Sequence, residues 1–118
     1  MMNRGVWGLL LFACLCAPAT AQPEGVAGLW EHYFIEQERT VYLELSKHAI
    51  IVWSIYDDGK CTRFPGAADW QGDRMNRVGQ DWRVRLEDPD LHVSFPDTTV
   101  TYRRSSDDPQ TLCRREDI

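Results

Sequence analysis

The sequence predicts an all-β domain, an antiparallel up-and-down meander of seven or eight strands that closes into a small barrel. Three observations predict this class. Apolar and polar residues alternate over several short segments, helix signals are scarce, and turn sequences rich in Asp, Gly and Pro separate the segments. A β-sandwich is the alternative, because a meander exposes its edges unless it closes or pairs with a second sheet.

The first half of the chain carries three of the expected strands. The first begins at Gly28-Leu29-Trp30, and the second spans residues 41–45, where every other residue is apolar. Residues 49–56 are apolar on both faces, which predicts either the best-covered strand or one that lines a cavity while packing on a neighbour. The run Asp57-Asp58-Gly59-Lys60 is a hairpin signal that ends this strand.

The second half begins with a less regular stretch. Residues 65–79 contain three glycines and no clear period, so we expect a long loop or an irregular strand pair there. Alternation returns in three short strands, at residues 82–86, 91–95 and 100–103. Tight turns separate them at 88–90 and 96–97, and a loop at 105–109 precedes a short last strand at 111–114.

Residues 1–21 have the organisation of a secretion signal peptide. Arg4 is the only charge, an apolar run follows it, and Pro18-Ala19-Thr20-Ala21 places small residues at the two positions that a signal peptidase reads. We expect cleavage after this segment, which leaves residues 22–118 as one periplasmic or secreted domain.

Two other interpretations of this segment are membrane attachments. The apolar run is shorter than the roughly 20 residues that cross a bilayer, so we expect no transmembrane anchor. The sequence Leu11-Phe12-Ala13-Cys14 resembles a bacterial lipoprotein box. The alternative to a cleaved, released protein is therefore a lipoprotein anchored through Cys14.

The charge balance excludes some partners. The whole chain has a net charge of −5, and removal of Arg4 with the signal leaves 12 basic and 18 acidic residues, a net charge of −6. This balance argues against a nucleic-acid surface and against attraction to anionic lipid headgroups. It is compatible with a solvated extracytoplasmic protein or with an acidic face for a basic partner.

The cysteines predict one disulfide. Cys14 and Cys16 lie in the signal, which leaves Cys61 and Cys113 as the one possible pair in an oxidising compartment. A loop of about 52 residues closed by this bridge should stabilise the fold by roughly 4 kcal/mol. A redox or metal pair is the alternative, but no Cys-x-x-Cys motif and no cluster of His accompanies the two cysteines. The bridge would tie the last strand to the middle of the barrel.

The Gly28-Leu29-Trp30 triplet resembles the Gly-x-Trp motif that starts the first strand of lipocalins. In that family the Trp closes the base of the barrel, and an Arg from near the last strand packs over it. The resemblance implies a lipocalin-like barrel in which Trp30 is buried at the closed end beside Arg103 or Arg104. The length is similar to that of small bacterial lipocalin-like envelope proteins, and periplasmic lysozyme inhibitors share this size and topology.

A barrel of about eight strands can hold one small apolar ligand. The candidate ligand-binding residues are large apolar or aromatic side chains of the expected strands: Phe34, Leu43, Trp53, Ile55, Trp82 and Tyr102. The alternative is that these side chains fill the barrel as a packed core.

A protein partner is the competing hypothesis. Trp70 lies in the irregular stretch near Arg74 and Arg77, and an exposed Trp beside arginines has the composition of an interaction hot spot. A small acidic domain of this kind would act as an inhibitor or immunity protein against a lysozyme-like or toxin enzyme. The alternative is that Trp70 covers one end of the barrel.

Catalytic and metal signals are weak. The candidate catalytic carboxylates fall in turns, at Asp57, Asp58, Glu87, Asp88 and Asp90. No Gly-x-Ser-x-Gly motif is present, and the three histidines lie in or beside separate strands, at His32, His48 and His92. Of the three histidines, only His32 is an even number of positions from Trp30 and Phe34 in the first strand, so only His32 is expected on their inward face. We therefore expect a monomeric, non-catalytic binding protein, without cofactor or metal, for a small apolar molecule or a lipid.

Overall fold

The computed structural model of this chain describes residues 21–116, whose strands form one curled sheet with the shape of a half-barrel. The strands are β1 (Gly28–Phe34), β2 (Arg39–Leu45), β3 (Ala49–Tyr56), β4 (Lys60–Ala67), β5 (Asp69–Gln71), β6 (Arg74–Arg77), β7 (Gln80–Glu87), β8 (Asp90–Phe95), β9 (Thr98–Arg104) and β10 (Arg115–Glu116). A short 3₁₀ helix, η1 (Ile35–Gln37), joins β1 to β2. Nearly all of the expected signal peptide, and with it Cys14, lies outside the described residues.

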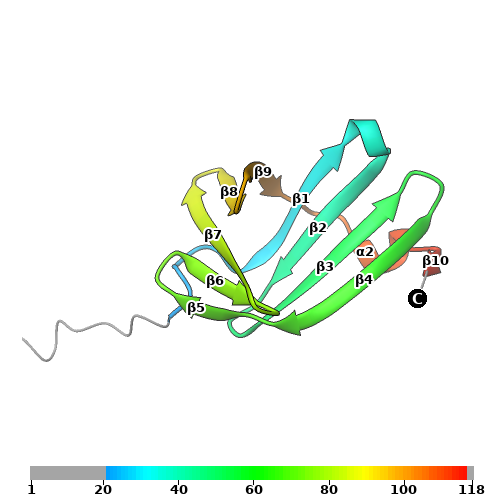
Figure 1. Cartoon of the computed structure of the whole chain (residues 1–118). Coiled ribbons are helices and arrows are strands. Elements are labelled where there is room, and N and C mark those ends of the chain that lie inside the picture. The colour runs from blue at the N-terminus through cyan, green and yellow to red at the C-terminus, as the bar shows by residue number, and fades with distance from the viewer. Residues whose placement is uncertain (1–20, 117–118) are drawn as a thin grey trace, which may run out of the picture.

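The half-barrel consists of two wings, which Figure 1 shows meeting where β4 continues into β5. We call β1–β4 the first wing and β5–β9 the second wing. The chain passes between them through Ala68, a buried residue whose N–H donates to the carbonyl of His48. On the other side, β1 pairs with β9 only at Trp30 and Glu31, so the two wings are joined over a short length.

The all-β, barrel-like architecture is confirmed, but the prediction of a purely antiparallel sheet of seven or eight strands was wrong. The sheet has ten strands, because residues 65–79, expected as a long loop or an irregular strand pair, contain the end of β4 and the short strand pair β5–β6. It is mixed because β10 pairs parallel with β4, at Lys60 and Cys61.

The expected last strand at residues 111–114 is also corrected. Its first residues belong to a helical turn, α2 (Pro109–Leu112). Asp108 caps this turn, since its carboxylate accepts hydrogen bonds from the Gln110 N–H at 3.2 Å and the Thr111 hydroxyl at 2.8 Å. Pro109 has the fixed backbone angle that suits a first helical position. The signal for this helix is therefore the Asp-Pro pair.

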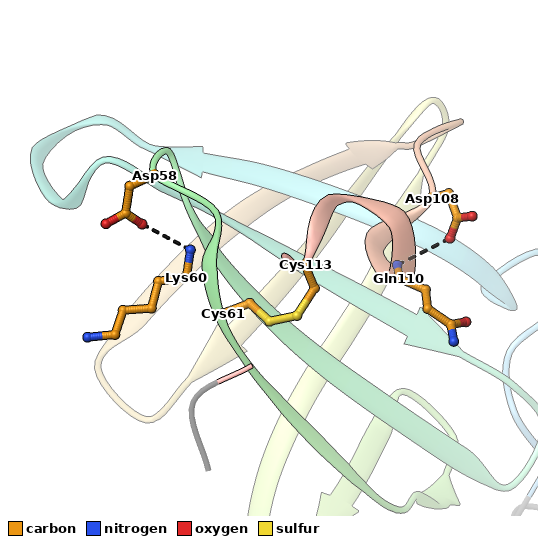
Figure 2. Close-up of a disulfide and its surroundings, with 6 residues drawn as sticks. All are labelled: Asp58, Lys60, Cys61, Asp108, Gln110 and Cys113. Atoms are coloured by element: carbon orange, nitrogen blue, oxygen red, sulfur yellow. Dashed lines mark hydrogen bonds between the residues drawn. A yellow bond between two sulfur atoms is a disulfide. The ribbon is translucent and has the colours of Figure 1, made fainter. Parts of the chain in front are cut away.

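The disulfide between Cys61 and Cys113 is confirmed, although its position differs from the expected one. Figure 2 shows Cys61 in β4 joined to Cys113 at the end of α2. The strand that closes onto β1 is β9, and the bridge instead holds residues 108–116 against the first wing. We call residues 108–116 the C-terminal strap.

Each face of the first wing carries its own buried cluster. The face towards the second wing, here the inner face, belongs to the main core, which includes Trp30, Leu43 and Ile50. The opposite, outer face has a smaller cluster of Tyr42, Trp53, Ile55 and Cys61, packed against Cys113 of the strap. The strand at residues 49–56, apolar on both faces, is accordingly covered on both.

Candidate functional site

The Trp30 end of the half-barrel is closed by an arginine. Trp30 is fully buried, and its indole N–H donates to the carbonyl of Val26 at 2.9 Å. The Arg104 guanidinium lies 4.1 Å from the centre of the indole ring. Arg104, rather than its neighbour Arg103, therefore packs over this tryptophan.

Gly28 is required at this end by the same arginine. Arg104 donates hydrogen bonds to the carbonyls of Ala27 and Gly25, which places its guanidinium directly over Gly28. A Cβ at Gly28 would collide with Nη1 of Arg104, and the positive φ of +131° also disfavours any side chain there. The Gly-x-Trp spacing is thus explained by one arginine that crosses the glycine and stacks on the tryptophan.

The candidate ligand-binding residues do not share one face. Phe34, Leu43, Trp82 and Tyr102 belong to the main core or pack against it. Trp53 and Ile55 lie on the outer face instead, under the strap, which corrects the expectation that all six residues line one cavity. The reason is strand parity, because Val52 is the inner neighbour of Trp53 and pairs with Leu43.

The middle of the half-barrel is occupied by side chains. Trp30, Met75 and Leu91 are fully buried in the main core. Trp82 also lies there, with its ring centre 4.8 Å from that of Phe95 in an edge-to-face contact. Of the two alternatives, packed core or open cup, this arrangement matches the packed core over the Trp30 end and the middle.

The inner face of the first wing becomes exposed away from Trp30. Phe64 pairs with Val52 and therefore lies on the same face, yet it is 54% exposed. Tyr56 is 38% exposed and occupies one row with Arg39 and Phe34. We call the inner surface of Phe34, Val52, Tyr56 and Phe64 the open side. An aromatic surface of this kind on an inner face is a candidate contact for an apolar ligand.

Arg39 borders the open side and is held by neutral groups. Its Nε donates to the Gln37 amide oxygen at 2.6 Å, and Nη1 donates to the Ser54 hydroxyl at 2.9 Å. Its guanidinium also lies 5.4 Å from the centre of the Phe34 ring. Among residues 21–116, no carboxylate is within ion-pair distance of Arg39. The charge of this arginine is therefore positioned but not neutralised.

Tyr102 of β9 is buried in the main core, on the inner face of the half-barrel. Burial raises the pKa of Tyr102 from 10.0 to about 12, against the opposing effect of the nearby Arg39 charge. Only 2% of its surface is exposed, so the neutral phenol is strongly favoured in the folded state. His32 lies beside it, with the two ring centres 5.9 Å apart, and donates from Nδ1 to the Thr101 carbonyl.

A pH dependence follows from Tyr102. Because its pKa is higher in the folded than in the unfolded chain, its stabilising contribution is complete below pH 10.0 and is lost as the pH rises towards about 12. The loss is up to about 2 to 3 kcal/mol. Urea unfolding at a series of alkaline pH values measures it. Tyr102→Phe should remove this part of the decrease in the free energy of unfolding between about pH 10 and 12. An equal decrease in the variant and the native protein would contradict the assignment to Tyr102.

The strap forms a groove with the outer face of the first wing. The groove has a volume of about 560 Å³ and is lined by Trp53, Arg63 and Glu44 on the sheet side and by Asp108 and Arg114 on the strap side. The Trp53 indole N–H donates to the Glu44 carboxylate at 3.3 Å, and Arg63 lies over the indole at 5.5 Å. Because the Trp53 ring is already covered by these contacts, the groove offers mainly polar groups to a ligand.

The three residues expected to bind a protein partner do not form one surface. Trp70 is only 3% exposed and belongs to the main core, so it covers the interior and is not an exposed anchor. Arg77 stacks on buried Trp82, with its guanidinium 5.6 Å from the ring. Arg74 alone lies on the outer face of the second wing. Alternation within the β5–β6 hairpin separates these side chains.

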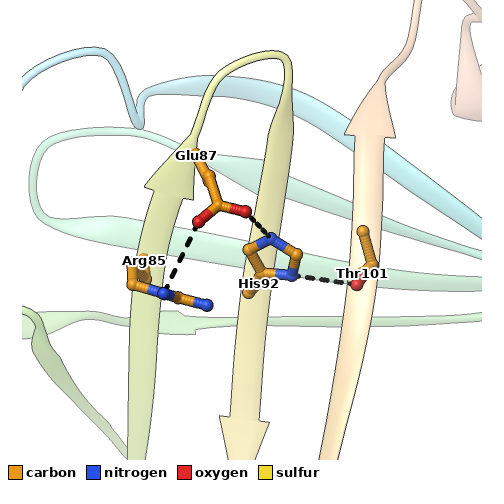
Figure 3. Close-up of polar contacts among 4 residues, drawn as sticks. All are labelled: Arg85, Glu87, His92 and Thr101. Atoms are coloured by element: carbon orange, nitrogen blue, oxygen red, sulfur yellow. Dashed lines mark hydrogen bonds and ion pairs between the residues drawn. The ribbon is translucent and has the colours of Figure 1, made fainter.

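An acid–imidazole–hydroxyl arrangement lies on the outer face of the second wing (Figure 3). His92 donates from Nε2 to the Glu87 carboxylate at 3.3 Å, and its Nδ1 lies 2.9 Å from the Thr101 hydroxyl. Glu87 is also paired with Arg85 at 3.6 Å, and both side chains are largely exposed. The Glu87 carboxylate therefore neutralises Arg85, and together with Thr101 it orients the His92 imidazole.

Residues 21–116 contain no group of three or more His, Cys, Asp or Glu side chains placed to bind a metal ion. The same residues include no helix with the length and apolar character needed to span a membrane.

Comparison of the chain with protein-family models, with curated proteins and with solved structures found no match.

Proposed function

We propose that the protein is a non-catalytic, extracytoplasmic binding protein for an anionic amphiphile, a molecule with an apolar chain and an acidic head. In this proposal the half-barrel works as a lipocalin-like cup whose base is filled. The ligand's apolar part lies on the open side, and its acidic head binds Arg39. The observation that carries the proposal is the position of an unneutralised arginine beside exposed aromatic side chains on an inner face.

The open side supports the apolar half of this proposal. Phe64 and Tyr56 present exposed ring surface, and Phe34 and Val52 continue it down to the main core. Burial of apolar surface gains roughly 25 cal/mol per Å², so covering these rings with an alkyl chain is favourable. The filled core supports a site on the open side, since Trp30, Met75 and Leu91 already occupy the space near the base.

Arg39 supports the acidic head. Its bonds to Gln37 and Ser54 fix the guanidinium without cancelling its charge. A carboxylate or phosphate that pairs with a pre-positioned guanidinium forms charge-assisted hydrogen bonds, which are about twice as strong as neutral ones. Acidic residues outnumber basic residues in the whole chain, so the protein as a whole does not attract anions. In this proposal the acidic head is therefore recognised locally, by the one guanidinium of Arg39.

The disulfide supports the extracytoplasmic part of the proposal. Bridges of this kind persist in oxidising compartments and are rare in the cytosol. The expected signal peptide at residues 1–21 points to the same compartments.

Calorimetric titration with dodecanoate, below its critical micelle concentration, tests the proposal. The native protein should bind dodecanoate, and Arg39→Gln should weaken binding about tenfold, because a charged hydrogen bond is lost. Dodecanol, which has the same chain and no charge, should bind both proteins equally.

Arg63→Gln is the matched control. This arginine also stacks on an aromatic ring, but it lies on the outer face. Its substitution should leave dodecanoate affinity unchanged. Equal losses in the two variants, or no loss in Arg39→Gln, would reject Arg39 as the head-group site.

A further inference from the structure

The outer face of the second wing carries a row of hydrogen-bond donors that crosses five strands. The register places one side chain from each of β5 to β9 directly opposite the next: Gln71, Arg74, Arg83, Ser94 and Thr99. We call these residues the donor row. Directly opposite side chains on neighbouring strands point to the same face, with Cβ atoms about 4.5–5.5 Å apart.

Two arginines stand side by side in the middle of this row. Arg74 of β6 pairs with Arg83 of β7, and both side chains are exposed. Like charges in directly opposite positions destabilise a sheet unless another group neutralises them. In the described part of the chain, neither arginine has a carboxylate within ion-pair distance.

Nearby charged residues have partners of their own, so the lack of a neutralising carboxylate is particular to Arg74 and Arg83. Arg85 lies two residues further along β7 on the same face, and Glu87 neutralises it (Figure 3). Asp81 is the acid nearest in sequence to Arg83, but its carboxylate accepts a hydrogen bond from the Asn76 amide at 3.0 Å and does not pair with an arginine.

The surface is hollowed at this point. A hollow of about 430 Å³ is bordered by the polar residues Arg74, Asp81, Arg83 and Ser94 and by the apolar residues Trp82, Phe95 and Pro96. A second hollow of about 260 Å³ continues from it, also bordered by Arg74 and Asp81 and extending to Asp69. Asp69 lies in β5, whereas Asp81 lies in β7 on the same face as Arg83 and borders both hollows. Arg83 and Ser94 border the first hollow only.

We propose that Arg74 and Arg83 bind a phosphate group, with the Ser94 hydroxyl as an additional donor. Ser94 can donate to the phosphate when its oxygen accepts from the Thr99 hydroxyl, which lies 2.9 Å away. Two guanidiniums on adjacent strands present several N–H groups to one oxyanion, and a phosphate offers enough acceptor oxygens to engage both. The bound phosphate would also neutralise the like-charge pair. This site is independent of the proposed amphiphile site, which lies on the inner face of the other wing.

Calorimetric titration of the native protein with inorganic phosphate and with glycerol 1-phosphate tests this site. Arg74→Gln and Arg83→Gln should each weaken phosphate binding about tenfold. Tighter binding of glycerol 1-phosphate than of the free ion would assign the phosphate to a larger ligand, and equal binding would assign it to free phosphate. No phosphate binding by the native protein overturns the proposal.

Arg85→Gln is the matched control, since this arginine has the same strand, face and exposure but already pairs with Glu87. It should bind phosphate as the native protein does, and a loss equal to that of Arg83→Gln would overturn the assignment. Thermal unfolding gives a second measurement. Phosphate should raise the Tm of the native protein and of Arg85→Gln by the same amount, and that of Arg83→Gln by less.

Discussion

Trp30→Ala should lower the free energy of unfolding by about 3 to 5 kcal/mol, the range observed for the truncation of fully buried large aromatic side chains. Trp30 is completely buried, donates to the Val26 carbonyl and supports the Arg104 guanidinium. Small domains have a total stability of about 5 to 15 kcal/mol, so the variant should be close to unfolding at room temperature. Urea unfolding followed by circular dichroism measures the change.

Arg103 and Arg104 provide a matched pair of controls for this end of the half-barrel. Arg104→Ala removes the cation from the Trp30 ring and leaves the Gly25 and Ala27 carbonyls without their donor, so it should cost about 1 to 3 kcal/mol. Arg103→Ala lies on the other face and should cost under about 0.5 kcal/mol, as exposed substitutions usually do. Equal effects of the two substitutions would contradict the role given to Arg104.

Loss of the disulfide should have the second large effect. The bridge joins residues 52 apart in the sequence, and a closed loop of that length stabilises by roughly 4 kcal/mol in the chain-entropy account. Cys61→Ala/Cys113→Ala should therefore show a urea midpoint far below that of the native protein. The native protein unfolded in a reducing agent should give a similar shift.

The same variant should also uncover Trp53. The strap covers this indole, which is only 5% exposed, and the disulfide anchors the strap to β4. Acrylamide quenching of tryptophan fluorescence under folding conditions should increase in the variant. If neither the urea midpoint nor the quenching changes, the bridge does not hold the strap in place.

Period-two patterns allowed the strands and their turns to be predicted. The alternation at residues 41–45 and 82–86 corresponds to β2 and β7, and the turn signal at 57–60 corresponds to the β3–β4 hairpin. The disulfide between Cys61 and Cys113 could be predicted by elimination, since only two cysteines remain after the expected signal peptide.

The two-sided strand β3 was the main source of error at the candidate site. Residues 49–56 are apolar at nearly every position, so their pattern does not distinguish the inner face from the outer face. The distinction comes from register with β2 and from the strap, which covers Trp53 and Ile55 from outside. A segment more than 50 residues away supplies that cover, and no local pattern encodes it.

Arg39 was missed for a related reason. It lies just after the β1–β2 turn, where a charged residue is ordinary, and its inner position depends on pairing with Phe34 and Tyr56. Trp70 was misplaced for a different reason, because its charged neighbours in the sequence suggested an exposed side chain, whereas the side chain is buried. Its burial comes from pairing with Met75, which in turn pairs with Trp82 to form one inner row across the second wing.

The most direct test of the central claim, that the open side binds an anionic amphiphile, is an amide chemical-shift map of the isotopically labelled protein titrated with dodecanoate. The largest shifts should fall on Arg39 and on the open side, at Phe34, Val52, Tyr56 and Phe64. Residues of the donor row and the strap should shift little. Shifts confined to the groove around Trp53, or to the outer face of the second wing, would contradict the claim.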